Sequence, residues 1–459
     1  MLTDTLWHAP VLSSETHFTA LRAREFARLD ADGHTYLDFT GSALYPRSLV
    51  DAHAAMLCDA VLGNPHSDNP ASLASAALVA EARARVLRYF DADPADYTVI
   101  FTANATGAIR LVADGFAFGA RTPLVLSADN HNSVNGVREL AGRAGAPVHA
   151  LPLAGDLTLA DPTLRLAELA RDSDGGLVAF PAQSNFSGAL HPLSLVRDAQ
   201  ALGFTVLLDA AAYVGTHRLS LGSVPADFVA LSFYKMFGYP TGVGVLIARH
   251  DALARLTRPW FAGGTVEWVS VQLARHQARA GAERFEDGSC DFVGIAAVSA
   301  GLDFLEHVGL ERIERHVTVL TERLVRGLRG LRFADGSPRV DVHGAHGASP
   351  CGATVAFNVR GRNGRVIPFA AVEARARAAR VSVRGGCFCN PGASERAFGF
   401  DAARTGDCLD RVTATGWSVE RFAACMDGVP VGAVRASLGM PSNVADVDRL
   451  LAVVEAMRE

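Results

Sequence analysis

The stretch FTVLLDAAAYVGTHRLSLGSVPADFVALSFYKMFGYPTGVGVLIA, residues 204–248, decides the fold of this chain. It contains three short apolar runs, FTVLLDA (204–210), DFVALS (227–232) and GVGVLIA (242–248), which turn-rich segments separate. Runs this short and this rich in Val, Leu and Phe are typical of strands that are buried on both faces of a mainly parallel sheet.

The same pattern extends toward the N-terminus. Three further runs precede the opening stretch: YTVIFTA (97–103), PLVLSA (123–128) and GLVAFPA (176–182). The intervening stretches, such as HPLSLVRDAQALG (191–203), suit crossover helices. Alternating strands and helices indicate an α/β architecture, so we predict a large α/β domain over residues 46–290. Sheets of this kind bind ligands at the carboxyl ends of their strands.

Beyond residue 290 the pattern changes to a long helical stretch, short strands and a terminal helix that begins near Val444. The helical stretch and the two clearest strands are residues 292–331, TVAFNV (354–359) and VPVGAVRASL (429–438). We predict that residues 291–459 form a smaller α+β domain and that residues 1–45 pack on it.

Composition narrows the functional classes. The chain has 459 residues, 49% of them hydrophobic, a formal charge of −5 and a pI near 6.3, so nothing favours a nucleic-acid partner. No basic and apolar leader is visible, and no uncharged apolar run reaches the ~18 residues of a membrane span. Seven cysteines form no disulfide framework and leave at least one free thiol or an intermolecular bond. We expect a cytoplasmic protein in a reducing compartment, with no membrane partner.

Two polar residues follow predicted strands in the opening stretch. Asp209 ends the run LLDA, and Lys235 follows another strand run among aromatic and apolar residues. An Asp in this position could simply cap a helix, and a single Lys is usually solvated. One arrangement uses both groups: the Lys amine forms a Schiff base with the aldehyde of pyridoxal 5′-phosphate (PLP), and the Asp carboxylate pairs with the protonated ring nitrogen. This interpretation predicts PLP as the cofactor and Lys235 as its attachment point.

The phosphate of such a cofactor needs hydrogen-bond donors. NATGAIR (104–110) follows a strand run and opens a helix, so Thr106 and Gly107 would present donors where a helix attracts anions. Ser232 and Tyr234, beside the lysine, could add hydroxyl groups. A junction of this kind alone is often no more than a helix cap.

Two further residues follow strand runs. His131 could stack on the cofactor ring, although a single His is more often structural, and Gln183 could contact the ring oxygen or the Schiff base. Because all these residues are predicted at the same edge of the sheet, the set is a stronger indication than any member.

Cys387 and Cys389 form a CxC pair. Zinc needs four ligands, and no second CxC or matching His pair lies nearby, so we expect no metal. A buried structural pair is the alternative to a reactive one. The flanking glycines and proline in RGGCFCNPG (384–392) indicate a mobile loop, and Arg384 could favour a thiolate. The other five cysteines lack such a context and are expected to be structural: Cys58, Cys290, Cys351, Cys408 and Cys425.

With these residues the chain resembles the class V branch of fold-type I PLP enzymes. Within that branch it is most similar to the PLP domain of molybdenum cofactor sulfurases, which are themselves similar to cysteine desulfurases. The matching stretches span nearly the whole chain: NATGAIRLVAD (104–114), DNHNSVNGVRE (129–139), FPAQSNFSG (180–188), LLDAAAYVGT (207–216), SFYKMFGYPTGVG (232–244), FAGGTV (261–266), RFEDGS (284–289), GGCFCNPGA (385–393) and GAVRASLGMPSNVADVDRL (432–450). The resemblance implies a fold-type I PLP-dependent transferase with a mainly parallel seven-stranded sheet.

The resemblance also implies a role for individual residues. Lys235 would carry the cofactor and act in catalysis with His131 and Cys389, the last of which accepts sulfur. Residues implied to bind the cofactor are Thr106, Gly107, His131, Gln183, Asp209, Ser232, Tyr234 and Lys235, with Gly264 and Thr265 reaching the phosphate of a neighbouring subunit in a homodimer. Arg435 and Asn185 would bind the substrate, the guanidinium pairing with its carboxylate.

The implied function is that of a PLP-dependent cysteine desulfurase. It would convert L-cysteine, or a related thiol amino acid, to L-alanine and pass a persulfide from Cys389 to an acceptor protein or small molecule. The family often has a cysteine where this chain has Ser394, and eukaryotic sulfurases continue into a module that binds the molybdenum cofactor, for which we expect no room here. Two alternatives stay open: another class V enzyme without a persulfide, such as a C–S lyase, epimerase or aminotransferase, and a PLP-binding sulfur-carrier scaffold without turnover.

Overall fold

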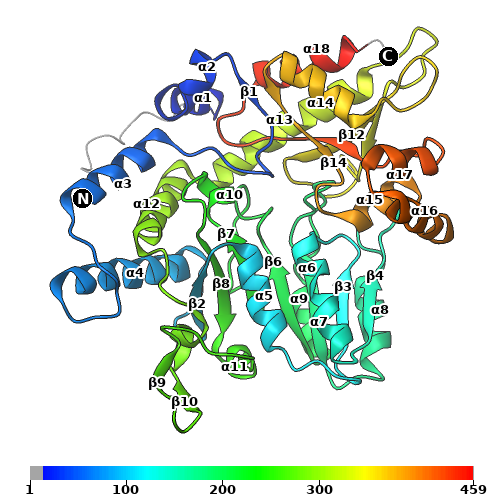
Figure 1. The fold of residues 1–459 in the computed structure, drawn as a ribbon. Helices are drawn as coiled ribbons and strands as arrows, with labels where there is room; N and C mark the ends of the chain where they lie inside the picture. The colour runs from blue at the N-terminus through cyan, green and yellow to red at the C-terminus, as the bar shows by residue number, and fades with distance from the viewer. Residues whose placement is uncertain (1–13, 458–459) are drawn as a thin grey trace.

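A seven-stranded sheet forms the centre of the larger domain (Figure 1). The structure is a computed structural model that describes residues 14–457. Within them the strand order is β2-β8-β7-β6-β5-β3-β4, and the bounds are β2 (Tyr97–Thr102), β3 (Leu124–Ser127), β4 (Val148–Leu151), β5 (Gly176–Pro181), β6 (Phe204–Asp209), β7 (Phe228–Ser232) and β8 (Gly244–Arg249). Strands β3 to β7 are parallel to one another, and β8 runs antiparallel to β7 and β2. The predicted mainly parallel α/β sheet is confirmed.

Six of the seven strands coincide with the apolar runs of the sequence. The seventh, β4, was not predicted; it lies at the edge of the sheet and pairs only with β3. Its first residue, Val148, is 43% exposed, and of its four residues only Leu151 is buried. The strand β2 lies at the opposite edge but is largely buried and was found, so the exposure of β4 removed the apolar signal.

Helices cover both faces of this sheet and bury its alternating side chains. In β6, Val206 and Leu208 face one hydrophobic cluster while Leu207 faces the other, as the two-residue period of a strand requires. The helices on the first face are α4 (Pro70–Tyr89), α9 (Leu195–Ala201) and α12 (Phe292–Val308), and those on the second are α5 (Ala105–Gly115), α7 (Val137–Arg143) and α11 (His250–Ala254). Burial on both faces fixes the strand ends, where polar residues follow.

The smaller domain is built on an antiparallel sheet in the order β11-β12-β15-β14. Its strands and main helices are β11 (Val340–His343), β12 (Thr354–Val359), β14 (Arg384–Gly386), β15 (Ala433–Ser437), α13 (Leu310–Gly330), α14 (Phe369–Ala378) and α18 (Val444–Glu455). The N-terminal segment joins this domain, because β1 (Thr35–Tyr36) pairs with β13 (Val381–Ser382). In addition, Arg22 of α1 (Ser14–Glu25) forms a buried ion pair with Asp446 of α18 at 2.6 Å.

The predicted helical stretch 292–331 is two helices, α12 and α13, which meet at an angle of 67° at Gly309. Helix α12 packs against α4 and α3 (Arg47–Asp59) of the larger domain, so it lies apart from the small sheet to which the sequence assigned it. The domain limits 46–290, 1–45 and 291–459 otherwise stay a prediction. In the described part of the chain no single helix is long and apolar enough to cross a membrane, although the bent pair α12–α13 passes that test together.

Helices α15 (Pro391–Phe398), α16 (Ala402–Thr415) and α17 (Val419–Cys425) lie between β14 and β15 in the chain. A disulfide joins Cys408 to Cys425, a pairing that the sequence did not predict; both cysteines pack in a small apolar cluster, in keeping with a structural role. The remaining elements are α2 (Arg28–Ala31), α6 (Asn132–Asn135), α8 (Pro162–Ala170), α10 (Tyr234–Phe237), β9 (Val266–Ser270), β10 (Arg275–Ala278) and the 3-10 helix η2 (Gly281–Phe285).

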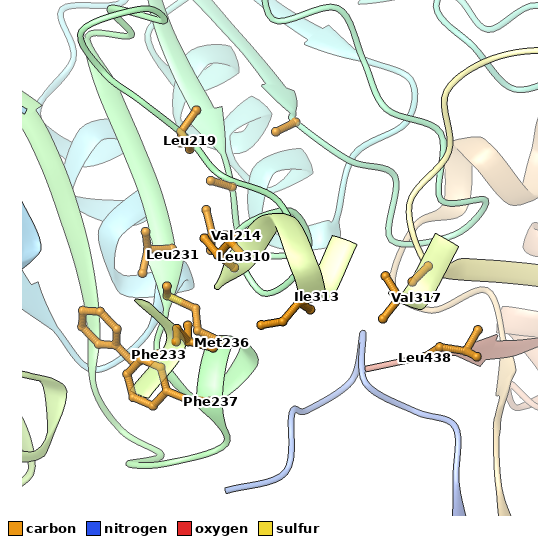
Figure 2. Packing of buried hydrophobic residues seen from close by; sticks show 14 of the residues in the cluster. Val214, Leu219, Leu231, Phe233, Met236, Phe237, Leu310, Ile313, Val317 and Leu438 are labelled. Carbon is orange, nitrogen blue, oxygen red and sulfur yellow. The ribbon is translucent and has the colours of Figure 1, made fainter. Parts of the chain in front are cut away.

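One apolar core runs from the large sheet into the small domain (Figure 2). Figure 2 shows Phe233, Met236 and Phe237 beside Leu231, with residues of α13 on the way to Leu438 after β15. The three residues are at most 1% exposed; Phe233 directly precedes the short helix α10, and Met236 and Phe237 belong to it. Their burial anchors that helix and holds both domains against it.

Helix α12 is packed so closely against this core that it requires a glycine. A Cβ added at Gly301 would come within 2.3 Å of the ring of Phe237, which is fully buried and cannot move aside. We expect Gly301→Ala to lower the free energy of unfolding by about 1–3 kcal/mol through overpacking, measured by denaturant titration. Gly142→Ala, in α7 with open space around it, should instead raise stability by about 0.5–1 kcal/mol. Equal effects of the two substitutions would contradict this account.

Candidate active site

Lys235 lines a cavity of about 340 Å³ at the carboxyl edge of the large sheet. It lies on α10, directly after β7, and the other strands bring their own residues to the same place. Asp209 ends β6, Gln183 follows β5 and His131 follows β3, and all three line the cavity with Lys235. The structure therefore brings together the residues that the sequence predicted at strand ends.

The amine of Lys235 is held in a form suited to nucleophilic chemistry. Burial lowers the pKa of Lys235 below its ordinary value, and the Asp209 carboxylate acts in the opposite direction, followed by lowering contributions from Arg435 and Arg384. A neutral amine can attack an aldehyde, whereas an ammonium cannot. Lys235 is also the only lysine in the sequence.

His131 presents a neutral ring to the cavity. Burial lowers its pKa, and the charge of Lys235 lowers it further, against the opposing effect of Asp209. Its Nδ1 atom accepts a hydrogen bond from the Ser133 backbone N–H at 3.1 Å. Because Nδ1 is an acceptor, the ring proton lies on Nε2. Ser133 itself lines the cavity and was missed in the sequence, where it read as one polar residue among several in DNHNSVNG.

The residues expected to bind the phosphate lie around the start of α5, but their hydrogen bonds differ from the prediction. The Gly107 backbone N–H donates to the side chain of Asn104, which caps α5, at 3.0 Å. Ser232 Oγ accepts from the Ala105 N–H at 2.7 Å, so its own proton is free to point elsewhere. Thr106 Oγ1 lies 2.8 Å from a second hydroxyl, that of Ser133. With Tyr234, Thr106 and Ser232 all line the cavity at the positive end of α5.

Arg435 approaches the cavity from the small domain, on β15. It is 2% exposed, donates to the Asn185 carbonyl at 2.9 Å and pairs with Asp38 at 3.0 Å. Asp38 also binds Arg384 at 2.6 Å, so two guanidinium groups share one carboxylate. The cluster carries one uncompensated positive charge, which suits a single bound carboxylate. Asp38 was missed because it lies in the N-terminal segment, far from the motifs in sequence.

Asn185 lines the cavity, but its side chain binds other residues of the protein, whereas the sequence predicted only that it binds a substrate. Its Nδ2 atom donates to the Phe388 carbonyl at 2.7 Å, and its Oδ1 atom accepts from Asn390 at 2.9 Å. These contacts hold the segment that carries the cysteine pair. One amide proton of Asn185 remains to donate to a substrate, and its predicted substrate-binding role stays a prediction.

The glycines that were expected to hinge a mobile cysteine loop lie in a strand, so that part of the expectation is wrong; the mobility of the cysteines stays a prediction. Arg384–Gly386 is strand β14, paired with β15, and Asn390 begins α15 with a fully buried side chain. Cys389 is exposed, and its carbonyl accepts from the Asn132 N–H at 2.7 Å, next to His131. Arg384 pairs with Asp38, which raises the pKa of Arg384 with a smaller contribution from Cys389. The arginine is therefore near the thiol but committed to another partner.

Gly264 and Thr265 do not reach this chain's own cavity. Thr265 is buried, and its hydroxyl exchanges hydrogen bonds with Ala262 at 2.9 Å, which closes the turn before β9. Their predicted contact with a neighbouring subunit stays a prediction. No group of three or more His, Cys, Asp or Glu residues within residues 14–457 could hold a metal ion.

The residues of the cavity fit PLP. Gln183 Oε1 is a buried acceptor that has no hydrogen-bond partner among the described residues, and a ring hydroxyl could donate to it. Lys235 would hold the aldehyde carbon, Asp209 the ring nitrogen and the residues around α5 the phosphate. The side chains of the cavity thus match the aldehyde, the basic ring nitrogen and the phosphate of this cofactor.

Comparison with known proteins identifies the class. The model of the aminotransferase class-V family matches residues 35–450, and the chain belongs to this family. A molybdenum cofactor sulfurase from Bos taurus is 36% identical over 462 residues, which cover 95% of this chain and 51% of the relative. One from Solanum lycopersicum is 33% identical over 482 residues, which cover 97% and 58%. The chain spans about half the length of the curated relatives it matches.

A solved structure agrees with these relatives. The apo cysteine desulfurase from Thermococcus onnurineus NA1 superposes with a TM-score of 0.78 at 25% identity, over 95% of this chain and 97% of that one. The resemblance inferred from the motifs and the predicted fold class are both confirmed.

The charges around Lys235 make a prediction about its titration. Asp209→Asn removes a negative charge that raises the pKa of Lys235, so the pKa should fall further. Because there is one lysine, the pH profile of its modification by an amine reagent in cofactor-free protein, mapped by mass spectrometry, reports this residue alone. We expect a midpoint below that of free lysine, ~10.4, and a still lower one in Asp209→Asn. Arg384→Gln removes a charge of the other sign and should move the midpoint up; a shift of both variants in the same direction would contradict this assignment.

Proposed function

We propose that this chain is a PLP-dependent cysteine desulfurase that converts L-cysteine to L-alanine and holds the removed sulfur as a persulfide on Cys389. The observation that carries the proposal is the convergence of Lys235, Asp209 and His131 in one cavity, with Cys389 tied to the residue that follows His131. The sulfurase and desulfurase names of the relatives support the same chemistry. When bound, PLP supplies an electron sink for the substrate carbon.

The residues of this chain divide the remaining work. Arg435 binds the substrate carboxylate, for which Asp38 orients the guanidinium. Lys235, whose pKa is lowered, accepts and returns the proton at the substrate carbon. The neutral ring of His131 packs against the cofactor and can hold a proton at Nε2.

Sulfur transfer is a displacement at sulfur. The Cys389 thiolate attacks the substrate sulfur, and a sulfur–sulfur bond forms as the bond from that sulfur to the substrate β-carbon breaks. The electron pair of the broken bond stays with the carbon, which takes up a proton to complete alanine. The product on the enzyme is a persulfide, which a protein or small-molecule acceptor then removes. We also propose a cytoplasmic location, because this chemistry needs Cys389 as a reduced thiol. The Cys408–Cys425 disulfide is an observation against this location, because such bonds are rare in reducing compartments.

A homodimer is the second part of the proposal. Large apolar side chains are exposed along one segment that ends in the projecting β9–β10 hairpin (Figure 1): Trp260, Phe261, Trp268, Val269, Val271 and Leu273, between 41% and 93% exposed. Exposed apolar side chains that gather in one segment are typical of a surface that another protein covers. Gly264 and Thr265 lie in the same segment. In a dimer formed through this segment, these two residues would lie near the cofactor site of the second copy.

Cys389→Ala tests the desulfurase proposal. The variant should bind PLP and L-cysteine as the wild type does, because Lys235 and Arg435 are unchanged, but alanine formation should fall by at least about 100-fold with the nucleophile gone. In the wild type, mass spectrometry after a single turnover should find one added sulfur on the peptide with Cys389. Cys387→Ala is the matched control and should keep most activity. Undiminished alanine formation in Cys389→Ala would favour a direct lyase, and a persulfide found only on Cys387 would move the nucleophile.

The dimer is tested on the exposed hairpin. A Trp268→Glu/Val271→Glu variant should sediment as a monomer, because burying two carboxylates in an apolar interface is unfavourable. Leu164→Glu, at a residue of similar exposure on α8, should leave the dimer intact. A wild-type monomer with full activity would disprove this part of the proposal.

A further inference from the structure

Two consecutive residues of the cysteine segment adopt the left-handed backbone conformation. Phe388 has φ 56° and Cys389 has φ 57°, although neither is a glycine. L-residues adopt this conformation only at an energetic cost, and a run of two is unusual outside glycine-rich turns. Strain of this kind persists only where surrounding contacts over-determine it, and it concentrates at functional sites.

The contacts that hold this pair come from the large domain. The carbonyl of Phe388 accepts from the Asn185 side chain, and the carbonyl of Cys389 accepts from the Asn132 N–H, each at 2.7 Å. Asn185 follows β5 and Asn132 follows His131, so both donors belong to the segments that line the cavity. The ring of Phe388 also lies under the Arg435 guanidinium, 4.8 Å from its centroid. Contacts with residues of the cavity and with Arg435 therefore hold the strained backbone in place.

Asn390 connects these contacts to a buried carboxylate. Its side chain is fully buried and uses both amide protons, one to Asp129 Oδ1 at 2.5 Å and one to Asn185 Oδ1 at 2.9 Å. Its Oδ1 atom accepts from the Ala393 N–H at 3.2 Å and so caps α15. One side chain therefore fixes the direction of α15 and the position of Asn185 together.

Asp129 is built to orient Asn390. It is 0% exposed and accepts two further hydrogen bonds, from Ser184 Oγ and from His191 Nε2, each at 2.8 Å. Three donors satisfy a buried carboxylate, which is costly to leave unpaired. Nothing in the proposed reaction uses Asp129, and its contacts lead only toward the cysteine segment and the strands beside it.

We propose that Asn390, oriented by Asp129, is a positioning residue that locks Cys389 at the mouth of the cavity in a strained, preorganised conformation. The proposal rests on the proposed function, because it assigns to Asn390 the geometry of the sulfur-transfer step. The Arg435 N–H donates to the Asn185 carbonyl while Asn390 holds the Asn185 side chain. Asn185 therefore links the group that binds the substrate carboxylate to the segment that carries the nucleophile, which fixes their separation.

This arrangement has a consequence for sulfur delivery. A thiol on a swinging loop could carry a persulfide to a distant acceptor, whereas Cys389 is fixed and solvent-exposed. The acceptor must therefore come to the mouth of the cavity and take sulfur from the place where it was received.

Asn390→Ala tests the proposal against Asn443→Ala. Each asparagine caps a helix of the small domain through its own Oδ1 atom: Asn390 caps α15, and Asn443 caps α18. Asn443 lies away from the cysteine segment. Measured on the PLP-loaded enzyme, Asn390→Ala should slow persulfide formation on Cys389 by about 100-fold, while the concentration of L-cysteine that half-saturates the cofactor spectrum changes less than about threefold. Asn443→Ala should lose its helix cap, with a smaller loss of thermal stability because no buried carboxylate is left unpaired, and should keep the wild-type rate.

Equal single-turnover rates in the two variants would overturn the proposal. A second readout separates it from the proposed function: the rate at which iodoacetamide alkylates Cys389, mapped by mass spectrometry, should rise several-fold in Asn390→Ala only, whether or not the enzyme forms a persulfide. Absence of persulfide in the wild type would therefore reject the function, and equal alkylation rates would reject the positioning role.

Hydrogen exchange on the unaltered holoenzyme covers the case in which Asn390→Ala does not fold. The Asn390 amide closes a turn by donating to the Cys387 carbonyl at 2.9 Å, as the Gly336 amide does to the Phe333 carbonyl at 3.0 Å in an exposed turn. Because Asn390 is fully buried and the large domain binds the carbonyls of Phe388 and Cys389, the Asn390 amide should exchange more slowly than the Gly336 amide. Exchange of the two amides at the same rate would overturn the proposal.

Discussion

Six strands of the large sheet, all except β8, run in one direction and end at one edge, and the whole site depends on this geometric constraint. Residues far apart in the sequence, His131 after β3 and Lys235 after β7, meet only because the carboxyl ends of parallel strands converge. The aromatic core around α10 then fixes the backbone position of Lys235. Burial lowers the pKa of its amine, which favours the neutral form that the chemistry needs.

The small domain completes the site from the other side. Its strand β15 supplies Arg435, and β14 leads directly into the cysteine segment. Asp38, between β1 and the start of the larger domain, holds two arginines with a single carboxylate. Arg435 and the cysteine segment both bind Asn185, which lines the cavity, and the apolar core that is continuous between the domains holds them there.

Much of this could be predicted from the sequence, and the parts that could not share a physical reason. Buried strands and strand-end residues leave a local pattern, so six of the seven strands, Lys235 and Asp209 were found directly. The edge strand β4 has no such pattern. Asp38, Asp129 and Asn390 act through hydrogen bonds between residues 55 to 397 positions apart, and no local pattern records such pairings. The glycine hinge was predicted wrongly because glycine and proline indicate a turn locally, whereas the pairing of β14 with β15 depends on residues far away in the sequence.

The scarcity of lysine has a consequence for the chemistry of an aldehyde cofactor. PLP condenses with accessible primary amines on any protein, and such adducts are inactive and consume cofactor. This chain carries its remaining basic charge on arginine, whose guanidinium stays protonated and does not form a Schiff base under these conditions. Its side chains therefore offer the aldehyde a single amine, at the end of β7, and selectivity for the correct position is achieved by eliminating every competing lysine from the surface.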